Sequence, residues 1–162
     1  TLNVAILKEN IVLNEVQDRV VLLPIACGDS MTLVDVKFRD LAYGDALQSI
    51  AGGDVLDSHL GELPHTMKIL QMSLDELFNG INLIRPNKIK IDVDGNEETV
   101  LRGLKGLLAT SNEIYFEDTF TVACKKFVDF LTELGFQEKA SAEMFSKDER
   151  SKSLGFNRIF KK

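Results

Sequence analysis

The pattern of apolar and polar residues changes abruptly between residues 88 and 108. Ile89, Ile91 and Val93 alternate with polar neighbours, which is the period of a β-strand with one buried face. The apolar residues that follow recur at helical spacing: Val100, Leu101, Leu104, Leu107 and Leu108. Between the two patterns the chain is acidic and carries a glycine. The pattern therefore predicts a strand that ends in carboxylates, turns, and continues as a helix.

The residues before this stretch predict a helix and two strands. Residues 1–14 carry a wide apolar face suited to a helix that lies on a sheet. Residues 20–27 form a continuous apolar run, as in a strand buried on both faces, although Pro24 removes one backbone donor. Residues 32–38 alternate and predict a second, less buried strand.

Further elements lie on both sides of the central stretch. Residues 67–72 predict a short strand, and the helix after it has Ser73 as its N-cap and Glu76 as the partner in a capping box. Residues 113–118 predict another strand that ends in acids, and residues 121–134 predict a helix with one apolar face.

The alternation of strands and helices predicts an α/β fold with a mostly parallel sheet. Gly135 is the expected stop of the last helix, and residues 155–162 predict an antiparallel strand, either at an edge or inserted into the sheet. We expect one domain over residues 1–162, with helices on both faces of the sheet.

Residues 39–66 are polar, carry several glycines and show no period, so we interpret this segment as a lid or an insertion. The only histidines, His59 and His65, lie here with Asp54, Asp57 and Glu62. Their spacing fits no standard set of metal ligands, so we interpret them as solvated loop residues and expect no metal site.

Composition narrows the class of function. The chain has 162 residues, 44% of them hydrophobic, and a formal net charge of −6, which disfavours binding to nucleic acid or to an anionic membrane. Only Cys27 and Cys124 occur, both among apolar neighbours, so we expect buried thiols and a cytoplasmic setting. The sequence begins inside a predicted helix, which suggests a piece of a longer protein.

The strand ends carry the candidate chemistry, because open α/β sheets bind ligands at the carboxyl ends of their strands. Asp92 ends the central strand, where a carboxylate accepts a hydroxyl proton, holds a cationic cofactor or ligates a hard cation. Glu117 ends the next strand and opens into the same crevice if the two strands are adjacent. Ala26, Cys27, Gly28 and Asp29 end a third strand, where a glycine lets a ligand approach the backbone.

The other acids of the central stretch have an ordinary structural interpretation. Asp94 is the expected N-cap of the helix and Glu97 its capping-box partner, while Glu98 and Arg102 form an ion pair on the outer face. Asp92 has no such structural role, so it is the acid on which we expect a functional site to depend.

The central stretch resembles the core motif of a known enzyme family. The matching residues are Ile89-Lys90-Ile91-Asp92-Val93-Asp94-Gly95-Asn96-Glu97 and Val100-Leu101-Arg102-Gly103. They resemble the FkbM family of S-adenosylmethionine-dependent methyltransferases. That family's neighbouring elements are resembled, in the same order along the chain, by segments 20–29, 72–77 and 114–117.

The resemblance implies a Rossmann-like class I methyltransferase fold with S-adenosylmethionine as the cofactor and an antiparallel C-terminal strand. It places Ala26, Cys27, Gly28 and Asp29 where this class meets adenine, and Asp92 where it faces cofactor and acceptor. The glycine-rich loop and the ribose-binding acid of the class are missing here, so we expect an N-terminally incomplete domain that lacks the first βαβ unit. The implied reaction is O-methylation of a hydroxyl on a glycan or a natural-product-like small molecule, with Asp92 and Glu117 catalytic.

Two other classes stay open. Asp92-Val93-Asp94-Gly95 is similar to the nucleophile motif of haloacid-dehalogenase-type phosphatases, which use Mg²⁺, but Asn96 stands where that family has threonine. A truncated or degenerate methyltransferase fold that only binds or assembles is the non-enzymatic alternative.

Overall fold

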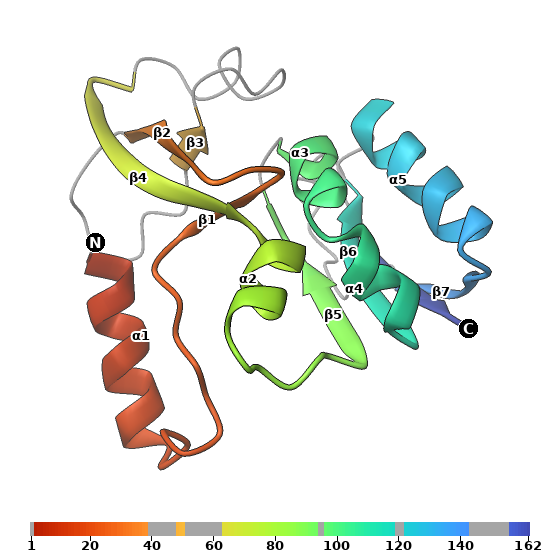
Figure 1. Cartoon of the computed structure of the whole chain (residues 1–162), viewed down its shortest axis with the longest axis horizontal. Helices are drawn as coiled ribbons and strands as arrows, with labels where there is room; N and C mark the ends of the chain where they lie inside the picture. The colour runs from red at the N-terminus through yellow and green to blue at the C-terminus, as the bar shows by residue number, and fades with distance from the viewer. Residues whose placement is uncertain (1, 39–47, 51–62, 94–95, 119–121, 143–155) are drawn as a thin grey trace.

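The computed structural model describes residues 2–38, 48–50, 63–93, 96–118, 122–142 and 156–162. The described strands form two sheets of four strands each. Figure 1 shows the first sheet beside the N-terminal helix and the second sheet behind the helices of the C-terminal half.

The second sheet has the strand order β5-β6-β8-β7. β5 (Lys88–Ile91) pairs parallel with β6 (Glu113–Asp118), and β8 (Phe156–Lys161) pairs antiparallel with both β6 and β7 (Gln137–Ala142). β8 therefore lies between two strands that run in the opposite direction. The predicted antiparallel strand near the end of the chain is confirmed, and it is inserted rather than at an edge.

The first sheet has the order β1-β4-β2-β3. β1 (Ala26–Gly28) pairs parallel with β4 (His65–Ser73), while β2 (Thr32–Phe38) pairs antiparallel with both β4 and β3 (Gln48–Ile50). The strand predicted over residues 67–72 is confirmed as part of β4. β3 lies inside the segment interpreted as a lid, of which residues 39–47 and 51–62 are outside the described residues.

The mixed α/β arrangement is compatible with a methyltransferase fold, but the single, mostly parallel sheet is not confirmed. Among the described strands only the β1–β4 and β5–β6 pairings are parallel. Parallel neighbours need a long crossover connection, which α3 and α4 supply between β5 and β6. No helix is described between β2 and β4, and these two strands pair antiparallel.

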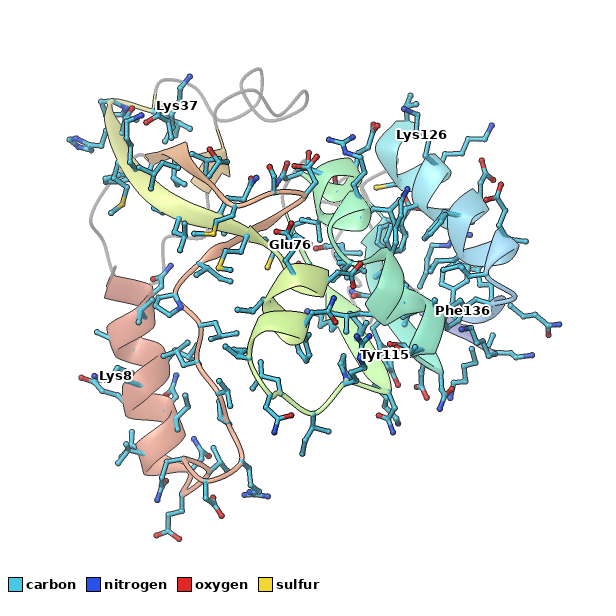
Figure 2. The ribbon with its side chains drawn as sticks, in the orientation of Figure 1. Lys8, Lys37, Glu76, Tyr115, Lys126 and Phe136 are labelled. Carbon is cyan, nitrogen blue, oxygen red and sulfur yellow. The ribbon has the colours of Figure 1, made fainter. Side chains whose placement is uncertain are left out.

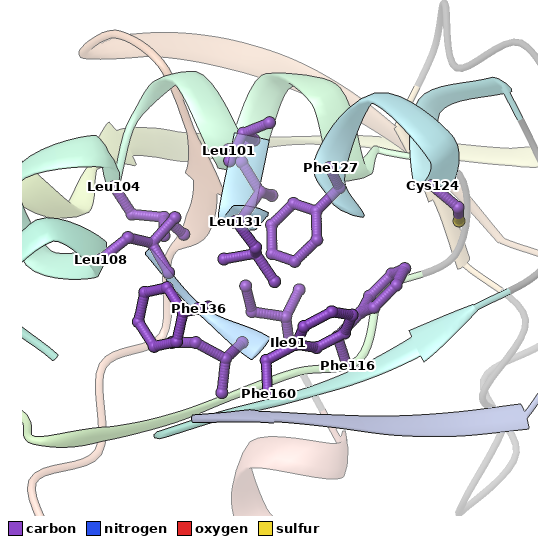
Figure 3. Close-up of a cluster of buried hydrophobic side chains, with 12 residues drawn as sticks. Ile91, Leu101, Leu104, Leu108, Phe116, Cys124, Phe127, Leu131, Phe136 and Phe160 are labelled. Carbon is purple, nitrogen blue, oxygen red and sulfur yellow. The ribbon is translucent and has the colours of Figure 1, made fainter. Parts of the chain in front are cut away.

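The main core lies between the second sheet and α3 (Glu97–Arg102), α4 (Lys105–Thr110) and α5 (Val122–Glu133). Figure 3 shows Phe116 of β6 against Phe127 of α5, and their ring centroids are 4.7 Å apart. Alternation along β6 sends Ile114 and Phe116 into this core and leaves Tyr115 on the other face. The core thus fixes the face of β5 and β6 that packs on the helices.

The helix predicted over residues 1–14 is confirmed as α1 (Leu2–Leu13), but its expected packing on a sheet is not. No residue of α1 whose burial is described is fully buried, and Val12 and Leu13 are among its most exposed side chains. The apolar residues of α1 lie all around the helix, so no single orientation buries them together.

The buried strand predicted over residues 20–27 is wrong at its start. Only Ala26–Gly28 forms β1, and Val20 and Val21 are exposed. Pro24 has no backbone N–H to donate, and pairing begins only after it.

The single helix predicted after the central strand forms as two. α3 ends at Arg102 and α4 starts at Lys105, because the carbonyl of Gly103 turns away from the helix and accepts hydrogen bonds from Ser73 Oγ and Asp75 N, both at 2.9 Å. Ser73 is also the N-cap of α2 (Leu74–Gly80) and accepts from the backbone N–H of Glu76 at 3.3 Å. The Ser73 half of the predicted capping box is therefore confirmed.

The helix predicted over residues 121–134 is confirmed as α5, and Gly135 ends it with φ of 85°. The Phe136 N–H bonds to the Leu131 carbonyl at 3.0 Å and the Gly135 N–H to the Thr132 carbonyl at 2.9 Å, which is a Schellman motif.

Among the helices described here, none combines the length and the apolar character that crossing a membrane requires.

Candidate functional site

The structure brings together the ends of two of the three strands that carry candidate site residues. β5 and β6 are parallel neighbours with Ile91 opposite Phe116, so the next residues along each strand, Asp92 and Glu117, lie side by side. This adjacency was the condition for their opening into one crevice. β1 belongs to the other sheet and reaches this region through α3.

Asp92 lies in a small network of charged groups. Lys90 donates to its carboxylate, and the Asp92 side chain is 48% exposed. The hydrogen bond from Lys90, followed by a hydrogen bond from Glu117, holds the pKa of Asp92 below its usual range. Asp92 is therefore ionised at neutral pH, and it lies beside a second carboxyl group, that of Glu117.

Asp29 is held at the end of β1 by two donors. Arg102 Nε donates to Asp29 Oδ2 at 2.9 Å, and Ser30 Oγ donates to Asp29 Oδ1 at 3.1 Å. The hydrogen bond from Arg102 is the main reason why the pKa of Asp29 lies below its usual range. The carboxylate is ionised, and each of its oxygens keeps a further lone pair for a ligand.

Arg102 continues this network into α5. Its Nη1 donates to Glu98 at 3.1 Å, which confirms the predicted pair, and Lys126 Nζ donates to the other oxygen of Glu98, also at 3.1 Å. Figure 2 shows Lys126 projecting from α5. Alternating charges thus join β1, α3 and α5.

The other residues proposed to contact the cofactor lie on β1 itself. Ala26 and Gly28 are buried and Cys27 is partly buried, where burial raises the pKa of its thiol. A Cβ at Gly28 would lie 2.1 Å from Cδ of Gln71, so a larger residue here would have to displace the Gln71 side chain. The close approach of a ligand to the backbone at Gly28, expected from the sequence, stays a prediction.

The helix-start interpretation of the central acids needs correction. α3 begins at Glu97 with Asn96 as its N-cap, and the Asn96 side chain makes no capping hydrogen bond. Glu97 is therefore the first helical residue rather than the third, and it is 2% exposed. Asn96 Nδ2 instead donates to the Cys27 carbonyl at 3.4 Å. Asp94 and Gly95 lie outside the described residues.

The histidines do not meet the strand-end acids in what the structure describes. His65 is exposed on β4, with its ring centroid 5.4 Å from that of Phe38 on β2. His59, Asp54, Asp57 and Glu62 lie outside the described residues. Among the side chains that are described, no three of the His, Cys, Asp and Glu type are grouped so as to hold a metal ion.

One residue at the site was missed by the analysis of the sequence. Arg158 of β8 donates to Asp118 Oδ2 at 2.8 Å and to Glu138 Oε2 at 2.7 Å, and hydrogen bonding to Glu138, then to Asp118, raises its pKa. Asp118 is buried at the end of β6. The only available signal in the sequence was that Arg158 stands between Phe156 and Phe160 at the two-residue spacing of one strand face.

Comparison with known proteins gives one match. Residues 3–138 match the family model described as the methyltransferase FkbM domain. No curated protein and no solved structure matches the chain. The matched residues include β1, β5 and β6, whose ends carry the candidate site.

Proposed function

Because the chain belongs to the FkbM family of methyltransferases, we propose that it transfers a methyl group from S-adenosylmethionine to a hydroxyl group. The family match over residues 3–138 is the observation that carries this proposal. The adjacency of Asp92 and Glu117 at the ends of parallel strands supports it, since such strand ends are where open α/β sheets bind ligands.

We assign adenine recognition to the end of β1, at Ala26, Cys27, Gly28 and Asp29. An ionised carboxylate accepts a hydrogen bond from the exocyclic amine of adenine. Asp29 is ionised at neutral pH because Arg102 holds its pKa below the usual range. The partly buried thiol of Cys27 and the buried Ala26 offer apolar contact to a ring.

Asp92 and Glu117 are the proposed catalytic residues. The cofactor supplies the methyl group on a sulfonium, and alignment of the acceptor oxygen with that group provides much of the acceleration. The acceptor hydroxyl must lose a proton, and we assign its acceptance to the neighbouring carboxyl groups of Asp92 and Glu117. The ionised Asp92 also offers a counter-charge to the amino group of the cofactor, which S-adenosylhomocysteine retains, and we therefore include it among the cofactor contacts.

The proposed acceptor is a small molecule or glycan rather than a polyanion. The net charge of −6 and the carboxylates at the strand ends would repel nucleic acid and anionic lipid. Both cysteines lie among apolar neighbours, and on this ground we place the activity in the cytoplasm.

Isothermal titration of the intact, full-length protein with S-adenosylhomocysteine tests the proposal. We expect binding by the wild-type chain and at least about tenfold weaker binding by Asp92→Ala, because a hydrogen bond or close contact to a charged group is lost. Asp35→Ala is the matched control, since Asp35 also pairs with one lysine and its side chain is 42% exposed. It should bind as the wild type does.

Absence of S-adenosylhomocysteine binding by the full-length wild-type protein contradicts the methyltransferase proposal. Equal binding by the Asp92→Ala and wild-type proteins contradicts the role of Asp92. The family match gives no support to the phosphatase alternative, and Mg²⁺-dependent phosphatase activity that disappears in Asp92→Ala would favour it instead. Binding without methyl transfer to any hydroxyl acceptor would favour the non-enzymatic alternative.

A further inference from the structure

The C-terminal end of α3 rests directly on the end of β1. A Cβ at Gly103 would lie 1.7 Å from the carbonyl oxygen of Gly28 and 3.1 Å from Cα of Asp29, so the two backbones are in contact. Arg102, the residue before Gly103, is brought beside Asp29 by this contact. Its Nε to Oδ2 distance of 2.9 Å is that of a good charge-assisted hydrogen bond.

The Arg102 guanidinium is itself fixed by other partners. Nη1 donates to Glu98 at 3.1 Å and Nη2 donates to Thr99 Oγ1 at 3.3 Å. Glu98 is in turn held by Lys126 at 3.1 Å. A planar guanidinium held on three sides has little rotational freedom, so its Nε presents a donor to Asp29 in one direction.

The Asp29 carboxylate is thereby held in one orientation while part of it faces solvent. Its side chain is 31% exposed, and Ser30 donates to the oxygen that Arg102 does not contact. A carboxylate alone at the end of a short strand would sample several rotamers, and a ligand would then have to select one of them.

We propose that Arg102 is a positioning residue that orients the Asp29 carboxylate to accept from the exocyclic amine of the cofactor's adenine ring. This inference rests on the proposed function. Arg102 contacts Asp29 and not the ligand, so it governs selectivity for the amine rather than the chemistry of methyl transfer. Its effect passes through one hydrogen bond, and a change confined to that bond distinguishes positioning from general support of the fold.

Two ligands that differ at position 6 of the purine ring, and in the hydrogen that the inosine base carries on N1, test this role. S-adenosylhomocysteine carries the exocyclic amine, and S-inosylhomocysteine carries an oxygen in its place. Isothermal titration of the native protein should show that Arg102→Met weakens S-adenosylhomocysteine binding about tenfold, the usual effect of losing a charge-assisted hydrogen bond. The affinity for S-inosylhomocysteine should change less than about twofold, so the selectivity between the two ligands falls.

Two further variants complete the experiment. Arg102→Lys keeps the charge without the planar fork and should give an intermediate selectivity. Arg85→Met removes another arginine, which donates to Asn79 at 2.7 Å in an exposed pair away from the strand ends, and should leave both affinities unchanged. Circular dichroism of each variant reports whether the fold is retained, and an exposed ion pair contributes little to it.

The outcomes separate this inference from the proposed function. If Arg102→Met lowers both affinities by the same factor, or neither, Arg102 does not position Asp29 and the methyltransferase assignment stands. Equal affinities of the wild-type protein for both ligands also overturn the inference, because no acceptor then recognises the exocyclic amine. If the wild-type protein binds neither ligand, the proposed function fails and the inference fails with it.

Discussion

At the scale of single residues, Gly103 is the point where several elements meet. Its Cα lies against the Gly28 carbonyl, and its own carbonyl accepts from Ser73 and Asp75. The glycine is required by this close approach rather than by an unusual φ, which is −86°. The position of Arg102 beside Asp29 depends on the same approach.

We expect Gly103→Ala to destabilise the protein by about 1–3 kcal/mol, the usual cost of forcing extra volume into a packed site. Urea unfolding followed by circular dichroism measures the change. Gly80→Ala is the control, because no atom lies within 4 Å of a Cβ built at that helical glycine. It should be as stable as the wild type or more stable by up to about 1 kcal/mol. A Gly103→Ala protein that unfolds at the wild-type urea concentration would show that the two backbones can separate at no cost.

The site residues that could be predicted from sequence are those fixed by local pattern. Asp92 and Glu117 each end a recognisable strand, and a helical connection between parallel strands brings such ends together. Arg102 and Asp29 are 73 residues apart, and Arg158 and Asp118 are 40 apart. Nothing in the sequence near either partner specifies such a contact, because it depends on how the sheets and helices pack.

At the scale of elements, α4 begins without a capping side chain of its own. Its N-cap position is Leu104, and the Asp75 carboxylate from α2 supplies the missing acceptors. Asp75 Oδ2 accepts from Gly106 N at 2.7 Å and Oδ1 accepts from Leu107 N at 2.9 Å. The Ser73-Leu74-Asp75 segment therefore starts two helices at once.

Asp75→Ala should lower the free energy of unfolding by about 0.5–2 kcal/mol, the usual range for losing a helix cap. Asp75→Asn keeps one oxygen acceptor and should lose less. Glu76→Ala makes the same substitution at the next, exposed position of α2 and should change stability by no more than about 0.5 kcal/mol. Thermal unfolding of the three variants ranks them, and equal losses at positions 75 and 76 would contradict the cap.

Elements were predicted from sequence where one apolar period extends over the whole segment. β6, α5 and β2 have such periods and form close to their predicted bounds. β7 is polar and poor in β-branched residues, and it forms because β8 offers it backbone partners. The break between α3 and α4 depends on Ser73 and Asp75, which lie far from it in the sequence.

At the scale of the whole molecule, ion pairs join three strands of the second sheet at the end where β5 and β6 begin and β8 finishes. Glu113 of β6 lies between Lys88 of β5 at 3.5 Å and Lys161 of β8 at 3.3 Å. A hydrogen bond from Tyr115, followed by the interactions with Lys161 and Lys88, holds the pKa of Glu113 below its usual range. Glu113, Asp29 and Asp92 are all more acidic in the folded chain than in the unfolded one.

Stability should therefore fall in acid. A carboxyl group whose folded pKa is depressed stabilises the fold above its unfolded pKa of about 4, and this contribution is lost as the pH falls through the folded pKa. Urea midpoints measured from pH 7 down to pH 3 should decrease below about pH 4.5. Glu113→Gln should be less stable than wild type at pH 7 and should approach it at the acid end. A constant difference at every pH would mean that the Glu113 charge does not contribute.

The insertion of β8 between β6 and β7 also constrains how the protein folds as it is made. β7 leaves the ribosome before the only described strand with which it pairs, and β6 gains its second neighbour only when residues 156–161 have been synthesised. Until then the backbone donors and acceptors along one side of β6 have no strand beside them. Completion of this sheet therefore waits for residues 156–161, and the nascent chain is most open to chaperones, or to mispairing with another copy, during that interval.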